Sequence, residues 1–325
     1  MNIAIYGYGN LGKGVELALK NYNDINLFGI FTRRDPHLIK TITNTKVYNS
    51  ADIYKYKENI DIVIICAGSA TELPKLSPLL AKDFNIIDSF DNHTNINSHY
   101  NNVNKSCIES NHIALISSGW DPGLLSLFRL YSKAILPNCT THTFWGKGIS
   151  QGHSNAVRKI DGVLDCVQYT IPIKKYINKA RKYCNFNLTN NQKHLRKCYV
   201  TIKKGANKLK IKQKIIRMPN YFTGYTTIIK FVSQKRINTM RKNFPHGATV
   251  ISTGKTGVYN ENKHIIEYNL KLNSNPEFTG NILLASARAI YKMKKKGEIG
   301  CKTIFDLTPT DFLDKSAEDV IKEFL

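Results

Sequence analysis

Short apolar runs alternate with amphipathic stretches along the first hundred or so residues. The runs predict strands over residues 2–6, 27–32, 62–66, 84–88 and 113–117, and the stretch after the first run predicts a helix over residues 12–21. Such alternation predicts a parallel sheet with helices on both faces. In open sheets of this kind ligands bind just beyond the carboxyl ends of the strands, so the turns there are where we look for a site.

The pattern of apolar and polar residues changes after Trp120, where longer strand-like segments predict a mixed α+β domain. We expect a helix over 124–135, strands over 140–145, 197–203, 226–232, 248–253 and 264–271, a returning helix over 278–295 and a closing turn and helix over 309–325. A chain of 325 residues exceeds one usual hydrophobic core. We therefore expect an α/β fold in which a Rossmann-type dinucleotide-binding domain, residues 1–120 with about 296–325, is joined to a mixed α+β domain, residues 121–295.

The net charge of +23 is uneven, because residues 166–260 contain no Asp or Glu. This stretch could attract anions, such as a phosphorylated cofactor, a dicarboxylate or nucleic acid. We favour the alternative that its lysines lie on solvated faces, several of them alternating along a strand-like edge, because no nucleic-acid motif accompanies the charge. The lysines in question are Lys203, Lys204, Lys208, Lys210, Lys212 and Lys214.

The sequence gives no sign of export or of metal binding. No apolar run approaches the roughly 20 residues that span a bilayer, and the first residues lack a basic region, so we expect a cytoplasmic protein. The seven cysteines follow no C-x-x-C spacing, which predicts reduced thiols rather than a zinc site or a disulfide framework. They are Cys66, Cys107, Cys139, Cys166, Cys184, Cys198 and Cys301, and we interpret Cys66 as a small buried apolar side chain.

A G-x-G-x-x-G loop, Gly7 to Gly12, joins the first strand to the first helix. In dinucleotide-binding folds these glycines allow a tight turn, close approach to the pyrophosphate and tight helix packing. An NAD enzyme carries an acidic residue about 20 residues further on, at the ribose 2′-hydroxyl. This chain has Thr32-Arg33-Arg34 instead, and guanidinium groups bind a 2′-phosphate, so we predict NADPH rather than NADH.

Two aspartates, Asp91 and Asp121, follow the fourth and fifth predicted strands. Either could simply cap a turn, since Asp before Asn or Pro often does so. Two carboxylates that converge at one sheet edge would, however, suit a cationic ammonium group.

Several longer strings then make the sequence recognisable. The chain resembles the meso-diaminopimelate dehydrogenase family from end to end, through the glycine loop, the Arg33-Arg34 pair and the following motifs: Ser118-Gly119-Trp120-Asp121-Pro122-Gly123, Thr143-Phe144-Trp145-Gly146, Ser150-Gln151-Gly152-His153-Ser154, Val167-Gln168-Tyr169-Thr170, Pro245-His246-Gly247, Leu270-Lys271-Leu272 and Asn275-Pro276.

The resemblance implies a homodimer that reversibly oxidises the D-centre of meso-2,6-diaminopimelate with NADP, giving L-2-amino-6-oxopimelate and ammonia. By motif, its cofactor contacts match Tyr8, Gly9, Asn10, Leu11, Thr32, Arg33, Arg34, Cys66, Ala67, Gly68, Ser69, Ser89, Phe90, Asp91, Ser118, Gly119, Trp120, Asp121 and Pro122. Its substrate contacts match Asp91, Asp121, Trp145, Gln151, Gly152, Thr170, Arg196, His246 and Asn275.

These residues suit definite roles. Asp91 and Asp121 would hold the reacting ammonium, and Arg196, Thr170 and His246 would bind the distal carboxylate. Trp145 would line the methylene chain, and the group that removes the ammonium proton is Asp121, His153 or water.

Two other interpretations stay open. One is another NADPH oxidoreductase of the same architecture that acts on a C=N bond, such as a dihydrodipicolinate-reductase-like protein. The other is an NADPH-sensing nucleic-acid-binding protein, which the acid-free stretch suggests. Asn155 departs from the aspartate that we expect in the family at that position.

Overall fold

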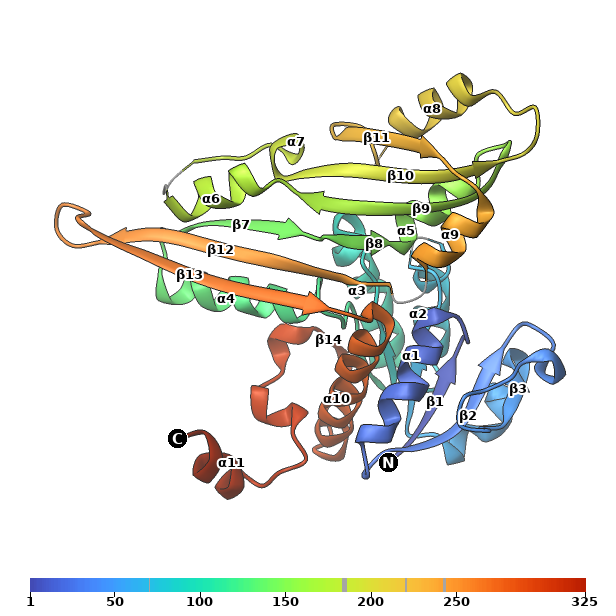
Figure 1. Cartoon of the computed structure of the whole chain (residues 1–325). Helices are drawn as coiled ribbons and strands as arrows, with labels where there is room; N and C mark the ends of the chain where they lie inside the picture. Colours follow the sequence, from blue (N-terminus) through green and yellow to red (C-terminus); the bar gives the residue numbers. More distant parts are fainter. Residues whose placement is uncertain (70, 183–185, 220, 242–243) are drawn as a thin grey trace. The chain divides into compact units, whose positions relative to one another are not determined.

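A computed structural model of the chain describes residues 1–69, 71–182, 186–219, 221–241 and 244–325 (Figure 1). The chain divides into two compact units, residues 1–127 with 276–325, and residues 128–275. No described helix is both long and apolar enough to cross a lipid bilayer.

The first unit contains a parallel sheet of seven strands within its described residues, in the order β14-β6-β5-β4-β1-β2-β3. The chain runs outward from β1 to β3 on one side and from β4 to β14 on the other, so the order reverses between β1 and β4, as in doubly wound folds. Its strands are β1 (Asn2–Tyr6), β2 (Asn26–Thr32), β3 (Val47–Asn49), β4 (Ile62–Ile65), β5 (Ile86–Asp88), β6 (Ile113–Leu115) and β14 (Gly300–Lys302).

Helices cover both faces of this sheet, which explains why all four residues of β4 are buried. The covering helices include α1 (Asn10–Ala18), α2 (Leu73–Leu80), α3 (Ile96–Ser110) and α10 (Asn275–Lys295). Helix α11 (Ala317–Phe324) has no buried residue, and α4 (Leu124–Ile135) spans the boundary between the units. 3₁₀ segments lie at Leu19–Asn21, Pro36–Leu38, Ser50–Asn59, His93–Asn95, Ile304–Asp306 and Pro309–Phe312.

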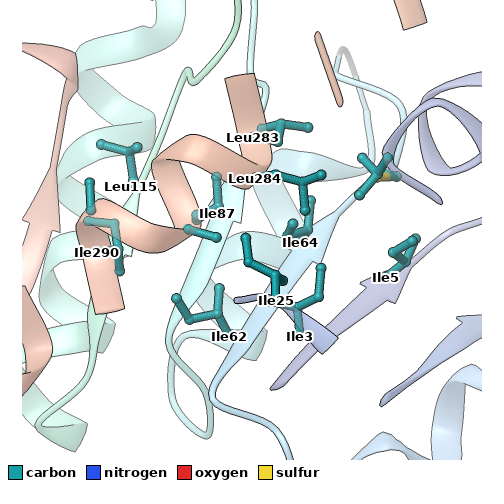
Figure 2. Packing of buried hydrophobic residues seen from close by; sticks show 14 of the residues in the cluster. Ile3, Ile5, Ile25, Ile62, Ile64, Ile87, Leu115, Leu283, Leu284 and Ile290 are labelled. Atoms are coloured by element: carbon teal, nitrogen blue, oxygen red, sulfur yellow. The ribbon is translucent and has the colours of Figure 1, made fainter. Parts of the chain in front are cut away.

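Alternate residues of the central strands supply the two cores of this unit. Figure 2 shows Ile3, Ile5 and Ile64 on the face where Leu284 and Ile290 of α10 pack. Ala4, Val63 and Ile65 point to the opposite face, where they meet side chains of α2 and α3. Both faces are therefore apolar, as the continuous apolar runs predicted.

The sequence assigned α10 to the second domain, and the structure corrects this. Leu283, Leu284 and Ile290 belong to the same core as Ile3 and Ile5 of β1. Gly14 of α1 also contacts the start of α10. The apolar stripe of this helix thus completes the first unit, and the boundary falls between Asn275 and Pro276.

The second unit contains two smaller sheets. β11, β10, β9 and β8 form one, in which only the pair β10 and β11 is parallel, and β13, β12 and β7 form an antiparallel second sheet (Figure 1). The strands are β7 (Thr140–Trp145), β8 (Gly148–Ser150), β9 (Val163–Pro172), β10 (His194–Ile202), β11 (Thr226–Phe231), β12 (His246–Thr256) and β13 (Asn262–Leu272). The helices are α5 (Gln151–Arg158), α6 (Lys174–Lys182), α7 (Asn190–Lys193), α8 (Lys208–Ile216) and α9 (Gln234–Met240). The α/β fold class with a separate α+β unit is confirmed.

The lysine-rich segment differs from its prediction. Lys208 to Ile216 form helix α8 rather than a strand edge, because Ile211 and Ile215, four residues apart, are buried in the core of this unit. Lys208, Lys210, Lys212 and Lys214 are exposed, as a solvated helical surface requires.

Candidate active site

The turns that were expected to contact a cofactor follow five strands of the first unit. β1, β2, β4, β5 and β6 are parallel, so the turns that begin at Gly7, Arg33, Cys66, Ser89 and Ile116 lie along one carboxyl edge of the sheet. The point at which the strand order reverses, between β1 and β4, falls in the middle of this row. The structure therefore brings the sequence-predicted cofactor turns together.

The three loop glycines have different neighbours. Gly7 has φ +100°, and a Cβ there would lie 2.6 Å from the Cys66 carbonyl oxygen, whereas a Cβ on Gly12 would lie 2.3 Å from the Gly7 carbonyl oxygen. A Cβ on Gly9 would meet no protein atom within 4 Å, and α1 begins at the next residue. The loop thus leaves open space in front of a helix N-terminus, where a pyrophosphate fits.

The Arg33-Arg34 pair already has partners in the structure. Arg34 donates from its guanidinium to the Tyr8 carbonyl oxygen, and Arg33 forms an ion pair with Glu72. The other carboxylate oxygen of Glu72 accepts a hydrogen bond from the Gly68 N–H at 2.7 Å. A phosphate that binds Arg33 would compete with Glu72, a residue that the sequence did not single out.

Sequence reasoning missed a second acidic residue, Glu16, which binds the Tyr8 side chain of the glycine loop. Its fully buried carboxylate accepts hydrogen bonds from the Ile42 N–H at 3.0 Å, the Thr43 N–H at 2.8 Å and the Thr43 hydroxyl at 2.6 Å, and from the Tyr8 hydroxyl. Burial, then the bond to Glu16, raises the pKa of Tyr8. Burial alone would raise the pKa of Glu16, but its hydrogen bonds outweigh that effect and lower it. An acidic residue inside an otherwise apolar helix face was the available signal.

Asp91 and Asp121 lie on the turns after β5 and β6. The Asp91 N–H donates to the Ser69 hydroxyl at 2.8 Å, which joins the turn after β4 to the turn after β5. The turn at Asp121 closes tightly, since Gly123 has φ +122° and a Cβ there would lie 2.0 Å from the Gly119 carbonyl oxygen. Asp91 is exposed and Asp121 half-buried, so both could meet a ligand.

The cysteines that the structure describes are buried thiols, and the backbone turn that begins at Cys66 lies on the same sheet edge. Six of them are free and buried, whereas Cys184 lies outside the described residues. Cys66 is 8% exposed, and burial raises the pKa of its thiol, as expected of a packing residue rather than a nucleophile. Among the described residues no group of His, Cys, Asp and Glu side chains could hold a metal ion.

In the second unit, Arg196 of β10 lies opposite Thr170 of β9 and donates to its hydroxyl. Arg196 is only 6% exposed, and its guanidinium lies 4.2 Å from the centre of the Tyr225 ring. Its Nε has no hydrogen-bond partner, and no carboxylate among the described residues forms an ion pair with it. Burial lowers the pKa of this arginine. A buried guanidinium in this state is suited to bind an anionic group.

Two histidines, His153 and His194, lie within reach of the charge of Arg196. His194 accepts a hydrogen bond from the Trp145 N–H at 2.7 Å, and the two rings stack with centres 5.1 Å apart. Burial and the charge of Arg196 lower the pKa of His153 to about 3, and His246 acts on it in the same direction. His153 is therefore neutral at pH 7 and a weak base, so the structure does not favour it as the proton acceptor.

The other predicted substrate contacts of this unit lie at element ends. Gln151 and Gly152 begin α5, and a Cβ on Gly152 would have open space around it. His246 begins β12 and is half-buried, and Asn275 donates its N–H to the Phe244 carbonyl oxygen at 3.2 Å. Asn155 is exposed on α5 and accepts from Arg158.

The family model for the "Diaminopimelic acid dehydrogenase C-terminal domain" matches residues 119–274. The meso-diaminopimelate D-dehydrogenase of Acetivibrio thermocellus is 48% identical over 100% of this chain and 98% of its own length.

Solved structures agree with this likeness. The Corynebacterium glutamicum diaminopimelate dehydrogenase in complex with DAP has a TM-score of 0.94 at 38% identity, and covers 100% of this chain and 99% of its own. An engineered D-amino acid dehydrogenase bound to NADP+ has a TM-score of 0.92 at 37% identity, with the same coverage. With relatives this similar over its whole length, the chain belongs to the meso-diaminopimelate D-dehydrogenase family.

Proposed function

We propose that this protein catalyses the NADP-dependent oxidative deamination of the D-centre of meso-2,6-diaminopimelate. The observation that carries the proposal is the buried Arg196, which has a hydroxyl partner in Thr170 but no carboxylate partner among the residues that the structure describes. A substrate with a second carboxylate at its far end supplies the missing counter-charge. Relatives that act on this substrate or bind DAP and NADP+ support the assignment.

The cofactor is held by the first unit. Gly9 and the N-terminus of α1 receive the pyrophosphate, and Arg33 and Arg34 the 2′-phosphate. The turns at Cys66–Ser69, Ser89–Asp91 and Ser118–Pro122 lie along the rest of the same edge. When bound, NADP+ supplies the hydride acceptor for oxidation of the amino carbon.

The aspartates act on the reacting end of the substrate. Asp91 and Asp121 hold the ammonium group so that the hydrogen on the D-carbon points toward the nicotinamide. As this hydride leaves and the nitrogen loses a proton, the amino carbon becomes an imine. Water then adds to the C=N bond and ammonia departs, leaving L-2-amino-6-oxopimelate.

The second unit selects the substrate. Arg196 and Thr170, with His246, bind the distal carboxylate, and Trp145 lies along the methylene chain. Gln151, Gly152 and Asn275 complete the substrate contacts. A D-amino acid without a distal carboxylate leaves Arg196 buried and unpaired, which is the physical basis of selectivity.

The test is direct. Purified protein is incubated with NADP+ and meso-diaminopimelate while nicotinamide reduction is followed at 340 nm, with the L,L and D,D isomers and D-lysine in parallel. We expect fast turnover of the meso isomer, little of the L,L isomer and slow turnover of D-lysine. Equal rates with D-lysine would contradict the role of Arg196, and no turnover of any isomer would contradict the proposed reaction.

We also propose that the enzyme is a cytoplasmic homodimer that serves lysine and diaminopimelate biosynthesis in the reverse direction. The family resemblance supports the dimer. Sedimentation analysis checks it, since a monomer at micromolar concentration would refute it.

A further inference from the structure

A single buried carboxylate ties together the two turns that carry Asp91 and Asp121. Asp88 ends β5 and is fully buried. Its Oδ1 accepts hydrogen bonds from the Phe90 N–H at 3.1 Å and from the Ser117 N–H at 3.0 Å. Its backbone carbonyl oxygen accepts from the Ser118 N–H at 2.9 Å. Asp88 therefore anchors the turn after β5 and the turn after β6 at the same time.

Two helices hold this carboxylate from its other side. The Ser77 hydroxyl of α2 donates to Oδ2 at 2.6 Å, and His99 Nε2 of α3 lies 2.6 Å from the same oxygen. Ser77 is fully buried and His99 only 3% exposed, and the His99 ring stacks on Phe90 with centres 4.2 Å apart. A buried carboxylate with four hydrogen-bonding groups around it has little freedom to move.

The geometry of the second turn requires such an anchor. Ser117 has φ +54°, a backbone conformation that is costly for a residue with a side chain. The bonds from Ser117 and Ser118 to Asp88 hold the chain in this conformation four and three residues before Asp121. Asp91 follows Asp88 by three residues in sequence. The two turns that carry the proposed substrate-binding carboxylates are thus held by the same residue, Asp88.

We propose that Asp88 is a positioning residue for the dehydrogenase reaction, and that Ser77 and His99 keep its carboxylate in place. The proposal rests on the proposed function. Asp88 contacts neither substrate nor cofactor in this scheme. It acts through the backbone of the two turns, so its removal should misplace Asp91 and Asp121 relative to the hydride that they orient.

The test compares Asp88→Ala and Asp88→Asn with a control. Alanine removes the acceptor for both turns, and we expect kcat/KM for meso-diaminopimelate to fall about 100-fold, the effect of a misplacement of roughly 1 Å. Asparagine keeps an oxygen for the two N–H groups but loses the charge that faces His99, so we expect a fall of about three- to tenfold. The matched control is Asp24→Ala, which removes a carboxylate that accepts from Arg288 at 2.6 and 2.7 Å near the opposite edge of the sheet, and should leave kcat/KM within about twofold of wild type.

The deuterium isotope effect on the D-carbon separates positioning from simple loss of folded enzyme. A structural defect lowers kcat in proportion to the active fraction and leaves KM and the isotope effect unchanged. Misplaced carboxylates raise KM for the diacid and make hydride transfer slower, so the isotope effect should increase in both Asp88 variants.

Asp88→Ala with wild-type KM and isotope effect overturns the proposal. If that variant does not fold, Asp88→Asn with wild-type kcat/KM and isotope effect overturns it instead. A wild-type enzyme without activity on meso-diaminopimelate would refute the proposed function itself, which is a separate and visible outcome.

Discussion

Gly14 offers the most direct test of how the first unit is built. A Cβ on Gly14 of α1 would lie 2.2 Å from the carbonyl oxygen and 2.4 Å from the carbonyl carbon of Pro276, at the start of α10. A Cβ on Gly280 would in turn lie 2.6 Å from the Gly14 carbonyl oxygen. These neighbours are backbone atoms, so Gly14→Ala forces the two helices apart by about 1 Å, and overpacking of this kind costs about 3 kcal/mol.

The same substitution also has a favourable effect, since alanine stabilises a helix interior by about 1 kcal/mol over glycine. We therefore expect a net loss of about 2 kcal/mol in the free energy of unfolding. Gly152→Ala is the control, because Gly152 also lies in a helix but its Cβ would meet no atom within 4 Å. That variant should be neutral or slightly more stable.

Urea unfolding followed by circular dichroism, with linear extrapolation to water, measures both changes. A Gly14→Ala variant as stable as wild type would refute the argument, since it would mean that α1 and α10 are not in close contact. Gly152→Ala with an equal loss would show instead that alanine is disfavoured for a reason unrelated to the helix contact.

Arg196→Met should lower kcat/KM for meso-diaminopimelate about 100-fold, because the distal carboxylate loses its guanidinium partner. Tm should not fall, because a buried guanidinium without an ion pair destabilises the fold. Steady-state kinetics and thermal unfolding measure the two effects, and a large fall in Tm would contradict the argument. Glu72→Gln should release Arg33 and lower KM for NADPH several-fold, with KM for NADH unchanged, whereas equal changes for both cofactors would refute competition between Glu72 and the phosphate. Burial alone would raise the pKa of Asp165, but hydrogen bonds from Gln234, Arg241 and Arg158 outweigh that effect and lower it. The carboxylate therefore stabilises the fold above its unfolded pKa of about 4, and this stabilisation is lost as the pH falls through the lower folded pKa. Asp165→Asn should therefore flatten the loss of stability on acidification, and an unchanged pH profile would show that the carboxylate is not stabilised in the fold.

The parallel sheet was predictable because of how it is buried. Strands covered on both faces are apolar along their whole length, and β1, β2, β4, β5 and β6 have this pattern. The sequence therefore placed each of them to within about two residues of its observed bounds. That the predicted cofactor turns share one edge of the sheet then followed from topology alone. What the sequence could not reveal is how those turns are held, since the bonds of Asp88 and Glu16 join residues distant along the chain.

The second unit was harder to predict because its strands carry buried polar residues. β9 was not assigned as a strand, although Gln168 and Thr170 within it are buried, because its apolar and polar positions fit no simple period. In α8 the alternating lysines suggested a strand, and the four-residue spacing of Ile211 and Ile215 was the stronger signal. A lysine side chain can extend to water from a helix or from a strand, so the spacing of the apolar residues is what distinguishes the two.

Arg196 shows what the structure adds to the charge of this unit. Residues 166–260 contain 21 Lys and Arg and no acidic residue, and from the sequence each of these cations could equally be a solvated charge. Exposed cations keep their water, but the Arg196 guanidinium is only 6% exposed and, within the described part of the chain, forms no ion pair with a carboxylate. This guanidinium lies beside the buried Thr170 hydroxyl on the neighbouring strand. We propose that the second carboxylate of the substrate offsets the cost of this burial when it binds, because the guanidinium is already desolvated and held in place before the substrate arrives.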